Sequence, residues 1–287
     1  MFRLLIAPAL TALALGLAVL PVAAPLRAET AAPEAAALAL TETMRIGAIV
    51  EVLREEGIDY GMSLEGELFP GRGGAAWRAA VERIYDTGTM RARFDRAFAA
   101  EMARAPEAIA AAQAFFGDAR GQNLLGLEIE ARRALLDEAV EDAARTAAED
   151  MAARDDPRMG MLRRFAEAND LIDANVQGAL NANLAFYRGM VEAGAMGEDM
   201  TEDQMLADVW GQEAEIRSET EDWLYPFLAL AYGPLPDADL QAYTDYSLTP
   251  AGKRLNLALF AAFDAVFTAI SLDLGRAAAL QMMGEDI

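Results

Sequence analysis

The chain of 287 residues contains no cysteine and no histidine. Without a thiol or an imidazole it has no disulfide framework, no Cys-His nucleophile and no Ser-His-Asp triad. Zinc, haem and iron–sulfur sites lose their usual ligands, and a di-iron carboxylate site loses its Glu-x-x-His motif. We therefore predict no catalytic residue, no cofactor and no metal site. Oxygen-ligated hard cations and acid–base chemistry by paired carboxylates stay open.

Positive charge is scarce as well, because 24 Lys and Arg face 46 Asp and Glu, for a net charge of −22. Lys253 is the single lysine, so every other cationic side chain is an arginine. Phosphate binding needs a basic surface, so this balance argues against a nucleic-acid partner and against electrostatic attraction to anionic lipid. With 54% hydrophobic residues the chain has enough apolar surface for a packed core.

The amino terminus has the order of regions that is typical of a secretory signal peptide. Met1-Phe2-Arg3 is followed by the apolar stretch 4–20 and then by small residues with two prolines. A spanning helix needs about 20 apolar residues, so we expect cleavage, with an uncleaved anchor as the alternative. We predict a signal peptide at 1–28, a mature helical domain at 29–287, location in the periplasm, and no stable membrane span after cleavage.

Apolar side chains recur every three or four residues along the mature chain, and no alternating run indicates a strand. Because the connecting segments are short, we predict an all-α antiparallel bundle of about nine or ten helices. Three long stretches are each expected to form one helix: 118–154, 157–191 and 201–232.

Several residues indicate where these helices begin, bend and end. Thr201 and Gln204 form the pattern of a capping box, and Pro226 is expected to kink the helix that follows. Residues 29–39 are expected to be loose, with Thr41 as the cap of the first helix and Gly57 as its end.

Two segments, Phe115 to Gly121 and Tyr246 to Gly252, share a pattern at a constant offset of 131 residues. In both, an aromatic residue precedes a helix cap, Asp118 or Thr249, and a glycine follows in the first turn, Gly121 or Gly252. We predict that the caps accept the free amides of the helix start and that the glycines allow close packing. The pattern suggests an imperfect duplication of units 77–140 and 223–280; the alternative is that two corners independently acquired good caps.

The second copy also carries a family resemblance. The run from Asp237 to Phe267, with Tyr-Ser-Leu-Thr-Pro-Ala-Gly-Lys at its centre, resembles a bacterial family of exported helical proteins. That family is a domain of unknown function of alphaproteobacterial type, with the signature aromatic-Tyr-x-Ser-Pro-x-Gly-Arg/Lys. Thr249 stands where serine is usual. The resemblance, which covers the chain from about residue 223, implies a periplasmic all-helical protein and no particular reaction.

Two polar clusters are candidates for a site. Helical spacing places Glu213 on an apolar face, with Arg217 one turn later as its natural partner. This carboxylate is either a general acid with a raised pKa or half of a structural ion pair. Asn175 belongs to an amide-rich stretch that could bind sugar hydroxyls or bridge helices; its stripe is Asn169, Asp173, Gln177 and Asn181.

These observations favour a non-catalytic binding or structural module, whose partner is a periplasmic protein or a second copy of the chain. The alternative is a carboxylate-dependent enzyme acting on envelope polysaccharide, with Glu213 as one of its two acids; a third hypothesis is an acidic cation-binding protein. Because no histidine titrates near neutrality, stability is expected to change little between pH 6 and 8. A transition near pH 6.5 would require a carboxylate with a raised pKa, and Glu213 is the first suspect.

Overall fold

The computed structural model describes residues 26–196 and 201–284, and all regular structure in these ranges is helical. This confirms the predicted all-α bundle, although the expected nine or ten helices are too few. Thirteen helices lie within the described ranges: α1 (Leu26–Thr43), α2 (Ile46–Leu68), α3 (Gly74–Ile84), α4 (Thr87–Met102), α5 (Pro106–Phe116), α6 (Ala119–Ala134), α7 (Glu138–Ala153), α8 (Pro157–Ala168), α9 (Leu171–Glu192), α10 (Glu202–Trp210), α11 (Glu213–Tyr232), α12 (Asp237–Leu248) and α13 (Pro250–Met283).

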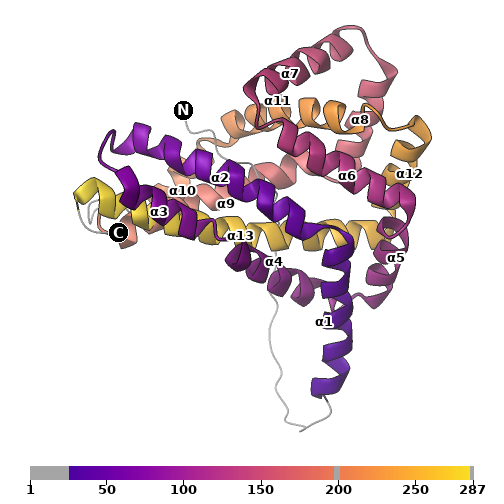
Figure 1. Ribbon diagram of the computed structural model, residues 1–287, viewed down its shortest axis with the longest axis horizontal. Coiled ribbons are helices and arrows are strands. Elements are labelled where there is room, and N and C mark those ends of the chain that lie inside the picture. Colours follow the sequence, from indigo (N-terminus) through magenta and orange to yellow (C-terminus); the bar gives the residue numbers. More distant parts are fainter. Residues whose placement is uncertain (1–25, 197–200, 285–287) are drawn as a thin grey trace.

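The long helix α13 runs through the length of the molecule and organises the packing (Figure 1). It packs along α9 and α4 and also contacts α3, α5 and α12. One large apolar core consists mainly of residues from α1, α2, α3, α4, α5 and α13. A second core consists mainly of residues from α6, α7, α8, α11 and α12. By length and composition α13 could cross a membrane; within the described chain 39% of its most apolar stretch is buried against other helices.

Two glycines let α9 and α13 touch backbone to backbone. A β-carbon added at Gly189 would lie 2.3 Å from the carbonyl oxygen of Leu272. One added at Gly275 would lie 2.2 Å from the carbonyl oxygen of Phe186. Since a side chain at either position would collide with rigid backbone, this crossing fixes how the two helices sit against each other.

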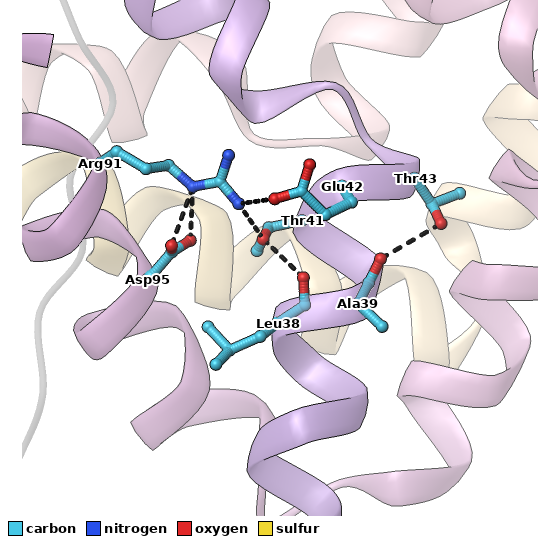
Figure 2. A network of polar contacts seen from close by, with 7 residues as sticks. All are labelled: Leu38, Ala39, Thr41, Glu42, Thr43, Arg91 and Asp95. Carbon is cyan, nitrogen blue, oxygen red and sulfur yellow. Dashed lines mark hydrogen bonds and ion pairs between the residues drawn. The ribbon is translucent and has the colours of Figure 1, made fainter. Parts of the chain in front are cut away.

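The first helix begins earlier than predicted, and Thr41 is not its cap. Residues 29–39 belong to α1, so the expectation of a loose segment was wrong. Thr41 is fully buried near the end of α1, where its hydroxyl donates to the carbonyl oxygen of Leu38 at 2.8 Å. The same hydroxyl accepts from Nη2 of Arg91 on α4 at 2.7 Å, and that nitrogen also contacts Glu42 at 2.6 Å (Figure 2). The polar residues of this segment therefore anchor α1 to α4.

Gly57 does not end the second helix, which continues to Leu68. A β-carbon at Gly57 would lie 2.0 Å from the ring of Tyr85, and one at Gly61 would lie 2.5 Å from Val81. The two glycines thus leave space on α2 for two side chains: that of Val81 on α3 and that of Tyr85, the residue after α3.

All three stretches predicted as single helices are divided. The first breaks before α7, which Asp137 caps by accepting from the amide of Ala139 at 2.9 Å. The second breaks at Asp170, whose φ of 53° lies in the left-handed region. The third breaks at Gly211, while Pro226 lies inside α11. The predicted capping box at the start of α10 is confirmed.

The predicted signal peptide lies outside the described residues except for its last three, which begin α1. Cleavage after Ala28 would remove these three residues and leave the remainder of α1, which includes the contacts with α4.

Candidate functional site

Both predicted helix caps are confirmed, and they have the same geometry. Asp118 accepts the amide of Gly121 through Oδ1 at 2.7 Å at the start of α6. Thr249 accepts the amide of Gly252 through Oγ1 at 3.0 Å at the start of α13. Each side-chain oxygen satisfies one amide that a helix start leaves without an intrahelical partner.

The two glycines are in close contact with the preceding helix, as predicted. A β-carbon at Gly121 would lie 2.2 Å from the carbonyl oxygen of Phe115, and one at Gly252 would lie 2.1 Å from that of Tyr246. The contact is made by the backbone of the aromatic residue rather than by its ring. Each corner is therefore a tight helix–cap–helix turn that tolerates no side chain at this position.

The structure brings the two corners together, which the sequence did not predict. The rings of Phe115 and Tyr246, which hold equivalent positions in the pattern, stack with centroids 4.3 Å apart and planes at 13°. Outside the corners the proposed units differ, because 77–140 spans most of α3, all of α4, α5 and α6 and the start of α7, whereas 223–280 spans half of α11, all of α12 and most of α13. The duplication stays a prediction.

A groove of about 980 Å³ lies where the two corners meet. Its floor is made largely of small and aromatic side chains from α5, α12 and the start of α13. The lining residues are Arg104, Ala105, Pro106, Glu107, Ala108, Ala111, Ala114, Phe115, Asp118, Tyr246, Thr249, Pro250, Ala251 and Arg254. The groove thus includes both caps and both stacked rings.

Few polar groups on this groove are free to meet a ligand. Asp118 and Thr249 serve as caps, and Arg254 pairs with Oε2 of Glu101 at 2.7 Å. Arg104 is exposed and makes no hydrogen bond or ion pair within the described chain. The hydroxyl of Tyr246 is buried, and it likewise has no partner there.

A buried carboxyl that sequence reasoning missed belongs to Glu128 of α6. The hydroxyl of Tyr232 on α11 donates to its Oε1 at 2.6 Å, and that of Tyr243 on α12 also bonds to it. Removal from water raises the pKa of Glu128 to about 7, although the two hydroxyls act in the opposite direction. Burial also raises the pKa of both tyrosines well above 10, so both stay protonated donors.

Aromatic rings connect this carboxyl to the groove. Tyr243 lies 5.7 Å from Phe115, measured between ring centroids, and Phe115 stacks on Tyr246. On its other side Tyr243 contacts Tyr232 at 6.4 Å and Phe165 at 4.8 Å. The carboxyl and the groove are thus parts of one packed region.

The polar cluster nominated from sequence is a surface ion pair, the second of its two predicted roles, and Glu213 is not the buried carboxylate that the first role requires. The Glu213 side chain is 43% exposed and lies 3.4 Å from Nη2 of Arg217, whose Nη1 meets Asp173 at 2.6 Å. Asn175 is buried, but it donates to the carbonyl oxygen of Leu171 in its own helix at 2.5 Å. No hydrogen bond or ion pair in the described chain joins Asn175 to the other two residues.

The amide-rich stripe of α9 bridges helices, which was one of its two predicted roles. Asn181 donates to Asp264 of α13 at 3.1 Å and accepts from Gln177 at 3.0 Å. Just before α9, the backbone carbonyl oxygen of Asn169 accepts from Asn256 of α13 at 2.6 Å, and the side-chain amide of Asn169 donates to the carbonyl oxygen of Phe165 at 2.9 Å. These amides are therefore engaged within the protein and are not free for a sugar.

Among the described residues, no group of three acidic side chains is placed to hold a metal ion. No family model, no curated protein and no solved structure matches this chain. The resemblance to an exported bacterial family consequently stays a prediction, and the site's own geometry is the basis for a functional proposal.

Proposed function

We propose that this chain is an exported periplasmic binding module that holds a ligand in the groove between its two corners and does not act as an enzyme. The observation that carries the proposal is the groove itself, with its apolar floor, its unpaired arginine and its unpartnered tyrosine hydroxyl. Its size falls within the roughly 300–1,000 Å³ of sites for small ligands, which are mostly apolar with a few polar groups.

The rigidity of the groove walls supports the same proposal. Both caps and both glycines lie at the corners that form the walls, so the two helix starts are fixed before any ligand arrives. A preformed site binds without the free-energy cost of ordering its own side chains and loops.

The alternative, a carboxylate-dependent enzyme acting on polysaccharide, draws less support from the geometry. Such an enzyme needs two acids about 5–10 Å apart across a cleft. Glu213, the acid nominated for this role, is an exposed partner of Arg217. The carboxyl with a raised pKa, Glu128, has two tyrosine hydroxyls as hydrogen-bond partners rather than a second acid.

The proposal is tested with N-phenyl-1-naphthylamine, a neutral apolar dye whose fluorescence rises on leaving water. Ala114 is exposed and lines the groove, so Ala114→Trp should fill it and abolish dye binding while leaving the helical circular dichroism unchanged. Ala147→Trp, an exposed position on α7 outside the groove, is the matched control and should bind like the wild type. Absence of dye binding, or binding that Ala114→Trp leaves intact, would reject the groove as the site.

A further inference from the structure

We propose that the groove's ligand is an amphiphilic anion, an apolar ring or chain that carries one acidic group for Arg104. This inference rests on the proposed function and names the class of ligand that the site selects. The described contacts supply three arguments: an unpaired cation, a buried hydroxyl with no partner, and an apolar floor.

Arg104 lacks a carboxylate in a chain where carboxylates are abundant. Acidic residues outnumber basic ones 46 to 24, and several arginines, such as Arg91, Arg132 and Arg276, are paired, whereas Arg104 is among those that are not. Arg104 instead lies beside the apolar start of α5, where no described acid reaches it. A guanidinium in this setting has donors available for a carboxylate or sulfonate, which it binds through two parallel hydrogen bonds.

The hydroxyl of Tyr246 is a second group without a partner. A buried polar group that makes no hydrogen bond is destabilising, so a ligand atom that reached this hydroxyl and accepted from it would supply the hydrogen bond that the free protein lacks. Burial raises the pKa of Tyr246 to about 12, which keeps it a neutral donor at physiological pH. Tyr246 and Arg104 both line the groove, and two donors without partners favour an anion over a cationic ligand.

The rest of the lining selects the body of the ligand. Alanine and proline side chains, together with the ring of Phe115, make a floor that offers dispersion contacts and no directional bonds. Glu107 is the opposing feature, an exposed carboxylate on the rim at the first turn of α5. This carboxylate should weaken the binding of an anion. Removing its charge should therefore strengthen that binding, which is the opposite of the effect expected at Arg104.

The test compares two dyes on the full chain: 8-anilino-1-naphthalenesulfonate, an aromatic anion, and N-phenyl-1-naphthylamine, which has the same rings without the sulfonate. Arg104→Gln should weaken the sulfonate about tenfold, a loss typical of one charged hydrogen-bonded contact. The neutral dye should change less than twofold. Arg96→Gln, which changes another exposed arginine, on α4 and outside the groove, should leave the binding of both dyes unchanged.

Two further variants separate binding from folding. Tyr246→Phe keeps the stacked ring but should weaken the sulfonate, while the free protein melts at the same or a higher temperature. Glu107→Gln should strengthen the sulfonate and not the neutral dye.

The outcomes separate this inference from the proposed function on which it rests. If Ala114→Trp blocks both dyes but Arg104→Gln affects neither, the groove is the site and the anion inference is overturned. If Ala114→Trp blocks neither dye, both proposals fail.

Discussion

At Gly252 one missing side chain decides how two helices meet. Replacing an ordinary glycine inside a helix with alanine stabilises the helix by about 0.5–1 kcal/mol. Here the new methyl carbon would lie 2.1 Å from a backbone carbonyl oxygen that belongs to a packed helix. We therefore expect Gly252→Ala to lower the free energy of unfolding by about 1–3 kcal/mol, measured by urea denaturation.

Gly66 provides the control for this substitution. It also lies inside a helix, α2, but an added β-carbon would have no atom within 4 Å. Gly66→Ala should accordingly stabilise the protein by a few tenths of a kcal/mol to about 1 kcal/mol. Equal stabilisation by both substitutions would show that the corner is looser than described.

Glu128 makes stability depend on pH in a protein without histidine. The folded chain keeps this proton up to about pH 7, whereas a glutamate of ordinary pKa releases it near 4.5. The proton-bound form is favoured in the folded state, so its stabilisation is complete below pH 4.5, declines between pH 4.5 and 7, and is absent above pH 7. The expectation of flat stability between pH 6 and 8 is therefore replaced by a decline that continues to about pH 7.

The measurement is the difference in unfolding free energy between wild type and Glu128→Gln at several pH values. Glutamine does not titrate, so this difference should fall by an amount on the order of 3 kcal/mol across the window. Glu130→Gln, at an exposed position on the same helix, is the matched control. If the difference in unfolding free energy between wild type and Glu128→Gln does not change with pH, the carboxyl is hydrated in solution.

At the scale of helices, one arginine makes the polar contacts that join α1 to α4. Arg91 of α4 bonds to Thr41 and Glu42 of α1 and to Asp95 of its own helix (Figure 2). Arg91→Met should lower the free energy of unfolding by about 1–3 kcal/mol, because the buried hydroxyl and the two carboxylates lose their donor. Hydrogen exchange should accelerate first in the amides of α1.

Arg96→Met on the same helix is the control for α1, since Arg96 is exposed and makes no ion pair in the described chain. If hydrogen exchange in α1 is as slow in Arg91→Met as in this control, then apolar residues such as Leu40 hold α1 in place instead.

The all-helical structure and the helix caps were predictable because both depend on residues close together in the sequence. The capping residues Asp118, Thr201 and Thr249 act within three positions of themselves, and the structure confirms all three. Helix breaks were not predictable at Asp170 and Gly211, because the apolar spacing continues across them and only the backbone turns. The break at Asp170 uses a positive φ, which aspartate adopts less readily than glycine.

The candidate site was harder to predict because its contacts are remote in sequence. The hydroxyl that bonds to Glu128 belongs to a residue 104 positions later, and the stacked partner of Phe115 lies on another helix pair. Glu213 looked buried because helical spacing reports which face is apolar. It does not report whether another helix covers that face.

At the scale of the whole molecule, the predicted export determines at which residue the mature protein begins. We expect mass spectrometry of the protein purified from its host to find Glu29 as the first residue. Cleavage there would leave the rest of α1 and its anchor on α4 in the mature protein. Recovery of chains that begin with Met1 from a soluble cytoplasmic fraction would contradict export.

The single lysine gives the molecule a practical property. Lys253 is exposed in the first turn of α13, between Gly252 and Arg254 of the groove corner. An amine-reactive dye should therefore attach to one side chain besides the amino terminus, close to the groove, without any engineered residue. Conversely, amine-directed crosslinkers can capture a partner only through this corner or the amino terminus, so a partner bound elsewhere would escape them. Fluorescence from a label at Lys253 thus provides a way to observe the groove in the unmodified sequence.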